Sequence, residues 1–269
     1  MRTIIHLSDL HFGRVDQALL GPLRDLIHSI APNVVVISGD LTQRARSEQF
    51  EEARAFLDTL PGPQIIVPGN HDISLYNVFR RFVKPLDRYK RYITDDLDPV
   101  YIDDEIAVLG VNTARSLTFK DGRVNDEQVA KIREQFAGLP AQITRVVVTH
   151  HPFDLPQGFR DDDLVDRAPM AMAAFAESGV DILMAGHLHA SHAGSTAERY
   201  QMDEYAALVI QAGTATSTRG RGEANSFNAV VTEDGHIRVE RYSWDEAAAD
   251  FVLAETERFE RTDKRWVRA

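Results

Sequence analysis

The stretch Val34-Val35-Val36-Ile37-Ser38-Gly39-Asp40 decides the fold. A run of β-branched residues without polar alternation is typical of a parallel strand that is covered on both faces. The run ends in Ser38-Gly39-Asp40, which puts a carboxylate just beyond the carboxyl end of the strand, where open α/β sheets bind ligands. A Gly-Asp pair is also typical of a turn or of a helix N-cap, so Asp40 alone does not define a site.

Four other apolar segments end in the same way, at residues 3–7, 64–67, 146–149 and 182–185. Helical periodicity between these segments, for example in residues 48–59, predicts repeated β-α-β units. Parallel strands of one sheet end at one edge, so the groups that follow them are expected to converge. These groups are Asp9, His11, Asp40, Asn70, His71, His150, His187 and His189. His6, His28, His192 and His236 lie elsewhere and are expected to be structural, and His151 is ambiguous.

The composition limits the partners of the chain. With 269 residues the length suits one large α/β domain. A net charge of −11 opposes a broad nucleic-acid interface. The absence of Cys leaves oxygen and imidazole as metal ligands. The chain enters a strand directly after Met1 and has no apolar run long enough to span a membrane, so we expect a cytoplasmic protein.

The C-terminal third has a different pattern. Residues 208–211 form an expected strand, and residues 227–232 and 236–242 form an expected hairpin joined at Asp234-Gly235. The change from β-α-β units to a hairpin indicates a second sheet packed on the first, within a single domain that covers residues 1–269. The catalytic core is expected at residues 1–230, and a hairpin and a helical tail are expected at residues 231–269.

A pair of divalent cations would explain why these groups are collected at one edge. Two cations about 3.5 to 4 Å apart need a carboxylate between them, and Asp40 on the central strand is the natural bridge. Such ions activate water as a nucleophile and stabilise phosphoryl oxygens, so the set predicts phosphate ester hydrolysis. His71 is placed to protonate the leaving group, and Asp72 is placed to orient the His71 ring.

The ordered blocks resemble the calcineurin-like metallophosphoesterase family over about residues 1–230. They are Asp9-Leu10-His11, Gly39-Asp40, Gly69-Asn70-His71-Asp72, His150 and Gly186-His187-Leu188-His189. The resemblance implies a four-layer α/β/β/α sandwich of two mixed sheets flanked by helices. It also implies one metal ion held by Asp9, His11, Asp40 and His189, a second held by Asp40, Asn70, His150 and His187, and His71 as proton donor.

Within the family, the Gly-Asn-His-Asp and His-His-Pro segments are similar to bacterial class III cyclic nucleotide phosphodiesterases. The branch that cleaves lipid A precursors tends to carry Arg where this chain has His71, which counts against that substrate. We therefore expect a dinuclear phosphodiesterase that uses two divalent ions, Mn, Fe or Zn, on a small diester such as a 3′,5′-cyclic nucleotide. The alternatives are a phosphomonoesterase, a nuclease or a non-catalytic binding protein. A homodimer is compatible with the resemblance.

Each of two further segments fits two interpretations. Residues 74–92 are aromatic and basic, and they fit either a packed helix with a solvated face or a substrate lid. Residues 211–228 form a glycine-dotted loop that is either an exposed connection or a substrate-binding segment. In the second interpretation Arg219, Arg221 and Asn225 bind the substrate.

Overall fold

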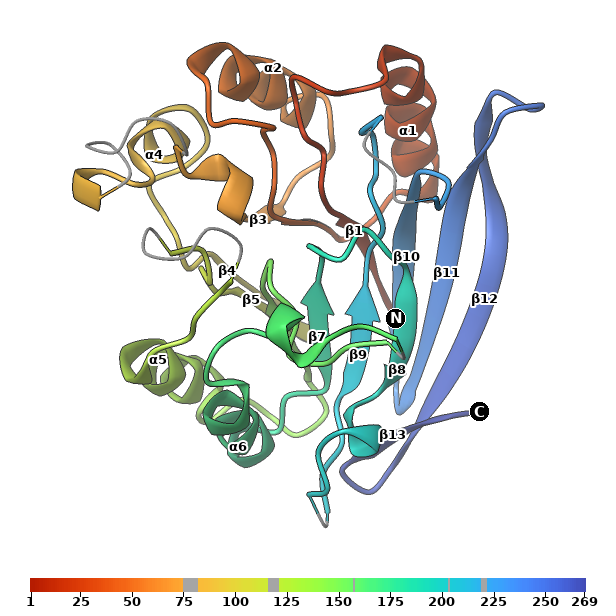
Figure 1. Ribbon diagram of the computed structural model, residues 1–269. Coiled ribbons are helices and arrows are strands. Elements are labelled where there is room, and N and C mark those ends of the chain that lie inside the picture. Colours follow the sequence, from red (N-terminus) through yellow and green to blue (C-terminus); the bar gives the residue numbers. More distant parts are fainter. Residues whose placement is uncertain (75–81, 116–120, 157, 203, 219–221) are drawn as a thin grey trace.

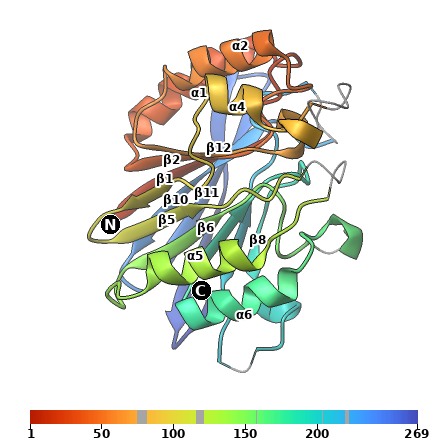
Figure 2. The ribbon, with the colours of Figure 1, turned by 90° about the vertical axis from the view of Figure 1, so that its left-hand side faces the viewer.

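The computed structural model describes residues 1–269 except residues 75–81, 116–120, 157, 203 and 219–221. Its described residues form two β-sheets that pack face to face between layers of helices (Figures 1 and 2). The expected four-layer α/β/β/α sandwich of two mixed sheets is confirmed.

The first sheet orders seven described strands as β13-β12-β11-β10-β1-β2-β3. Neighbouring strands β1, β2 and β3 are parallel, and the C-terminal strands join them antiparallel through β10. The bounds are β1 Arg2–Leu7, β2 Val34–Ser38, β3 Gln64–Val67, β10 Ser226–Glu233, β11 His236–Asp245, β12 Asp250–Thr262 and β13 Arg265–Arg268.

The second sheet orders six described strands as β4-β5-β6-β7-β9-β8. Its centre, from β5 to β9, is parallel, and antiparallel β4 and β8 lie at the edges. The bounds are β4 Val100–Ile102, β5 Ile106–Gly110, β6 Thr144–Val148, β7 Ile182–Ala185, β8 His192–Ser195 and β9 Leu208–Gln211.

Helices cover the outer face of each sheet (Figure 2). α1 (Gln17–Ile30), α2 (Ser47–Leu57) and α4 (Asp87–Tyr92) pack on the first sheet, and α5 (Asp126–Phe136) and α6 (Ala168–Ser178) pack on the second. Short 3₁₀ turns lie at Asn70–Asp72, Asp161–Asp163 and Thr196–Glu198. A capping box opens α5, because Asn125 accepts the Gln128 N–H and Gln128 accepts the Asn125 N–H.

The strand β2 shows why this sequence folds into these layers. All five residues of β2 are buried. Side chains of a strand alternate between its faces, so Val35 and Ile37 pack under the helices, whereas Val34 and Val36 pack between the two sheets. Burial of each such side chain contributes about 1.5 to 3 kcal/mol. The unbroken apolar run is therefore required by two cores, and it holds Asp40 at the end of a central strand.

The predicted helical tail at the C-terminus is wrong. Residues Asp250–Thr262 form β12, the longest described strand, and Arg265–Arg268 form β13. Ala, Glu and Arg in this stretch favour helix locally, but pairing with β11 buries Phe251 and Phe259. Cross-strand ion pairs between Arg241 and Glu255 and between Arg268 and Glu257 add to the pairing. These partners lie on the neighbouring strands of consecutive hairpins, and the helix propensity of β12 alone does not reveal the pairing.

The described part of the basic segment 74–92 forms α4 at its C-terminal end, while residues 75–81 lie outside the described residues. Tyr89 is buried against Phe50 of α2 and donates a hydrogen bond to the Ile66 carbonyl. The described helix α4 is therefore packed against the core. Among the described residues, no helix combines the length and apolar character that crossing a membrane requires.

Candidate metal centre

The predicted ligands lie in loops whose backbone is held in an unusual conformation. Five of them have a positive φ: Asp9 (53°), His11 (51°), Asp40 (52°), His187 (70°) and His189 (58°). A left-handed backbone at a residue with a side chain costs about 1 to 2 kcal/mol, and such residues cluster at functional sites. The carboxyl ends of β1, β2 and β7 therefore carry strain that turns these side chains toward a common point.

One group of ligands, here called half-site A, gathers around Asp9. The Asp9 Oδ1 atom lies 3.2 Å from His189 Nε2 and 3.5 Å from His11 Nε2. The two imidazole nitrogens lie 3.4 Å apart. Asp40 Oδ2 completes the group at 3.8 Å from His11 Nε2. Half-site A thus offers two carboxylate oxygens and two imidazole nitrogens.

A second group, half-site B, gathers around His150. The His150 Nε2 atom lies 3.1 Å from Asn70 Oδ1, 3.3 Å from His187 Nδ1 and 3.4 Å from Asp40 Oδ1. Asp40 therefore directs one carboxylate oxygen to each half-site. The structure brings the seven predicted ligands together at one place, and the metal-capable groups among them are Asp9, His11 and His189, and Asp9, Asp40 and His150, with His151 joining His150 and His187 in a third.

The donor atoms fit divalent cations. Nitrogen and oxygen ligands about 2.0 to 2.1 Å from one ion lie roughly 3.0 to 3.4 Å from each other, which is close to most of the separations in both half-sites. Asp9 Oδ2 is already bound by the Ser8 hydroxyl at 2.6 Å and the His187 N–H at 3.0 Å. Asp9 Oδ1 is buried and has no hydrogen-bond partner in the part of the chain that the structure describes. A buried carboxylate oxygen without a donor is costly, and a cation would satisfy it.

A hydrogen bond on the side of the His150 ring away from half-site B fixes the orientation of that ring. Its Nδ1–H donates to the Ser38 carbonyl at 2.8 Å, which turns Nε2 and its lone pair toward half-site B. Burial disfavours the charged imidazole, but the Asp40 carboxylate outweighs burial and raises the pKa of His150 to about 9. Burial likewise opposes ionisation of Asp40, and His150 more than offsets it and holds the pKa of that carboxyl below its usual value. The Asp40 carboxylate thus favours a positive charge on His150, and a bound cation would take the place of that charge.

Glycine is required where the motif loops touch the ligands. A Cβ atom on Gly69 would lie 2.1 Å from Asp40 Oδ1, and one on Gly186 would lie 1.8 Å from Ser8 Oγ. The backbone at both positions packs directly against the groups that hold the carboxylates. Steric exclusion of a side chain therefore explains why glycine occupies positions 69 and 186.

Comparison with known proteins agrees with this geometry. The sequence model of the calcineurin-like phosphoesterase family matches residues 2–191. The chain belongs to this family. It is a metal-dependent phosphoester hydrolase, and the calcineurin-like phosphoesterases use a dinuclear metal centre.

Two curated relatives of this phosphoesterase are phosphodiesterases. The chain is 25% identical over 229 residues to the glycerophosphodiester phosphodiesterase GpdQ of Enterobacter lignolyticus, covering 74% of this chain and 78% of the relative. It is 23% identical over 201 residues to the 3′,5′-cyclic adenosine monophosphate phosphodiesterase CpdA of Escherichia coli K12, covering 69% of each. Both are similar to this chain without fixing its substrate.

Solved structures share the fold of the phosphoesterase. A dimetal phosphatase from Danio rerio superposes with a TM-score of 0.70 at 12% identity and covers 97% of this chain and 99% of its own. The purple acid phosphatase PPD1 of yellow lupin gives a TM-score of 0.72 at 13% identity, covering 97% of this chain and 54% of that longer chain.

The predicted proton donor of the phosphoesterase lies beside half-site A. The His71 ring packs edge-to-face on the His11 ring with centroids 5.0 Å apart. Its main-chain N–H donates to Asp40 Oδ1 at 2.9 Å, and its Nδ1–H donates to the Gln43 carbonyl at 2.8 Å. The side-chain Nε2 of Gln43 also lies 3.3 Å from His71 Nδ1, and the sequence offered no signal for either contact of Gln43.

The expectation that Asp72 orients the His71 ring is wrong. The described hydrogen bonds of its carboxylate go instead to the main-chain N–H groups of Gly69, Leu41 and Thr42, at 2.9 to 3.2 Å, and to the Thr42 hydroxyl at 3.0 Å. Burial and the Asp40 charge raise the pKa of Asp72 to about 6. Asp72 therefore fastens the loop after β2 to the loop after β3, and it keeps Asp40 and Asn70 in register.

Of the predicted substrate residues, Arg219 and Arg221 lie outside the described residues. Asn225 is described, and its Nδ2 donates to the Thr214 carbonyl at 3.2 Å and to the Ser217 carbonyl at 3.0 Å. Its amide N–H groups hold the loop together, so the structure gives Asn225 a structural role in place of the expected contact with substrate.

Two of the remaining histidines, His6 and His28, make structural hydrogen bonds as expected. His6 is buried, hydrogen-bonds with the Ser38 hydroxyl at 2.9 Å, and has a pKa lowered by burial to about 3. His28 donates to the Thr59 carbonyl. The ambiguous His151 is buried against the rings of His150 and His187, with its Nδ1 2.8 Å from the Thr113 hydroxyl oxygen. It lies next to half-site B.

Proposed function

We propose that this phosphoesterase hydrolyses a small phosphodiester, such as a 3′,5′-cyclic nucleotide, and that His71 protonates the leaving oxygen. The observation that carries the proposal is the intact His71 imidazole, which is held by the Gln43 carbonyl against the ligand His11. A phosphodiester releases an alkoxide, which leaves poorly without a proton, and an imidazolium supplies that proton. The names of GpdQ and CpdA, which describe diesterases, support the same reaction class.

In this proposal Asp9, His11, Asp40 and His189 hold one divalent ion, and Asp40, Asn70, His150 and His187 hold the other, with Mn, Fe or Zn compatible with these ligands. When bound, the ions supply a water of lowered pKa and positive charge for the phosphoryl oxygens. The chain itself contributes three things: the Asp40 bridge, the Ser38 carbonyl that orients His150, and the His71 proton held beside the centre.

A substrate panel with metal-reconstituted protein tests the proposal. We expect cyclic nucleotides and bis(p-nitrophenyl) phosphate to be cleaved with a higher kcat/KM than p-nitrophenyl phosphate, the matching monoester. A preference for the monoester would show a phosphomonoesterase, and a preference for single-stranded DNA would show a nuclease. The net charge of −11 disfavours the latter.

A further inference from the structure

A hollow of about 510 Å³ lies at the carboxyl end of β5, and we call it the β5 pocket. Its volume is in the range of small-molecule sites. The floor consists of Ile73, Leu86 and Ala114, which are buried and belong to the core between the first sheet and its helices. Leu97 also lines the pocket and packs against the same core. Because close packing holds these side chains, the pocket has a fixed apolar floor.

The β5 pocket adjoins half-site B. The main-chain N–H of its lining residue Ile73 donates to the carbonyl of the predicted ligand Asn70 at 3.4 Å. On the other side, the parallel register of β5 and β6 places Asn112 of the lining opposite His150. Neighbouring strands are about 4.8 Å apart. The pocket therefore begins next to two ligands of half-site B, Asn70 and His150.

The rim of the β5 pocket carries an excess of positive charge. Lys84, Lys90 and Arg115 line the pocket together with one carboxylate, that of Asp87. Arg115 Nη2 donates to the neutral amide oxygen of Gln128 at 2.6 Å. Among the residues that the structure describes, no ion pair involves the side chains of the three cations. Three cations and one carboxylate give the lining a net charge of +2, in a chain whose net charge is −11.

The proposed proton donor lies at the other half-site. The His71 ring packs on His11 of half-site A, whereas the β5 pocket borders half-site B. In a diester held between the half-sites, the oxygen that His71 protonates leaves at the half-site A end. The second ester group, which the product retains, is then directed toward half-site B. The β5 pocket is placed to receive this retained group.

We propose that the β5 pocket binds the retained alcohol of the phosphodiester, and that it selects an apolar group of the size of an aromatic ring over a small or a cationic group. The proposal rests on the proposed diesterase function and names its substrate class. Transfer of an apolar group onto Ile73, Leu86 and Leu97 is favourable in proportion to the area buried. A quaternary ammonium or a protonated amine would lose water and meet Lys84 and Lys90. The pocket therefore favours diesters that carry an aryl group or a base over those that carry choline or ethanolamine.

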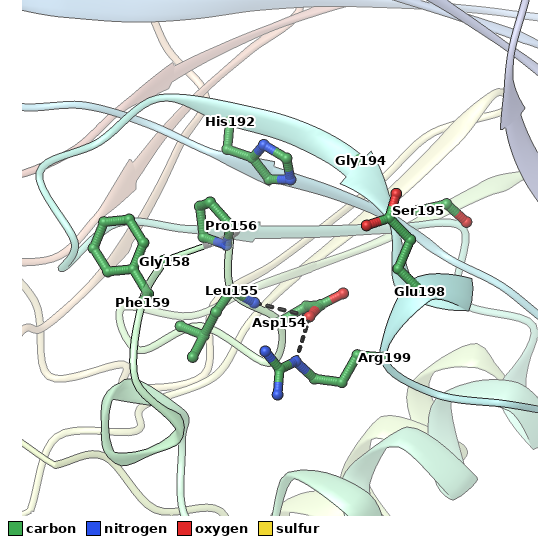
Figure 3. A pocket seen from close by; sticks show the side chains of 10 residues that line it. All are labelled: Asp154, Leu155, Pro156, Gly158, Phe159, His192, Gly194, Ser195, Glu198 and Arg199. Carbon is green, nitrogen blue, oxygen red and sulfur yellow. Dashed lines mark hydrogen bonds and ion pairs between the residues drawn. The ribbon is translucent and has the colours of Figure 1, made fainter.

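A larger hollow of about 640 Å³ is a weaker candidate (Figure 3). Its charged groups satisfy one another: Arg199 Nε lies 2.7 Å from Asp154 Oδ1, and Arg199 Nη1 lies 2.7 Å from Asp161 Oδ1. The carboxylate of Asp154 also accepts the Leu155 N–H at 2.8 Å, as the dashed lines in Figure 3 show. Binding there would have to compete with these contacts.

The test keeps the leaving group constant and varies the retained alcohol. Metal-reconstituted protein is given phenyl p-nitrophenyl phosphate, ethyl p-nitrophenyl phosphate and p-nitrophenyl phosphorylcholine, each of which releases p-nitrophenolate. We expect kcat/KM for the phenyl diester to exceed that for the ethyl diester by about tenfold or more, because the ring buries several more carbon atoms. The choline diester should be the poorest of the three.

Two variants test the floor and the rim separately. Leu97→Asn removes apolar surface from the pocket and should reduce the phenyl-to-ethyl ratio of kcat/KM by about threefold or more. Leu20→Asn is its control, because Leu20 is a half-buried residue of the same core outside this pocket. Lys84→Glu reverses an exposed charge and should raise the choline-to-ethyl ratio by about threefold or more. Lys264→Glu, the same change at an exposed residue outside the pocket, should leave both ratios unchanged. Ratios of substrates are insensitive to a partial loss of folded protein.

The outcomes separate the two proposals. Equal kcat/KM for the phenyl and ethyl diesters, a preference for the choline diester, or ratios that Leu97→Asn and Lys84→Glu leave unchanged would overturn the assignment of the β5 pocket. In each of these cases cleavage of the ethyl diester would leave the proposed function standing. Failure to cleave all three diesters would overturn both.

Discussion

Removal of the His71 imidazole should slow the cleavage of a diester only when the leaving group needs a proton. The variant His71→Ala keeps the main-chain N–H that donates to Asp40 Oδ1, so the bridge between the half-sites should persist. It loses the hydrogen bond from Nδ1 to the Gln43 carbonyl. The imidazole is half-buried, so we expect a loss of stability of only about 1 kcal/mol.

The magnitude depends on the leaving group. General acid catalysis contributes about 10²- to 10⁴-fold, equivalent to about 2.7 to 5.4 kcal/mol of barrier. A cyclic nucleotide expels a ribose alkoxide and should show the full loss. A nitrophenolate is stable as an anion, so we expect bis(p-nitrophenyl) phosphate to lose less than about tenfold.

The assay measures kcat for both substrates together with the metal content per chain. His28→Ala is the matched control, since His28 is an exposed imidazole that also donates to a carbonyl, that of Thr59, and lies on the far helix α1. It should change neither rate. An equal loss on both substrates in His71→Ala, at unchanged metal content, would refute proton donation.

Three further predictions follow from the centre and its support. Asp40→Asn should weaken binding of both metals by more than about 100-fold in a metal titration, and retention of two ions would contradict the bridge. Gly69→Ala should lower the free energy of unfolding by about 1 to 3 kcal/mol and reduce metal content, whereas Gly21→Ala, with open space around it, should not destabilise. For His6, the folded pKa of about 3 lies below the unfolded value of 6.5, so stability falls as the pH falls below 6.5. His6→Gln should reduce this slope by up to about 1.4 kcal/mol per pH unit in denaturant titrations, and an unchanged slope would contradict the neutral buried state.

Tertiary contacts decided two features that the sequence pattern did not. The segment Asp250–Thr262 is a strand because β11 pairs with it, although its composition favours helix. Asp72 binds the main chain of two loops that only the fold brings together.

The sequence by itself determined where the central strands end, which ligand types follow them and hence the reaction class. A buried parallel strand and the metal-binding residue at its end are contiguous in the sequence, as in the stretch from Val34 to Asp40. The fold decided which side chains face one another. Hydrogen bonds, pocket walls and strand partners join residues far apart in the chain, and their free energies depend on separations that no local pattern encodes.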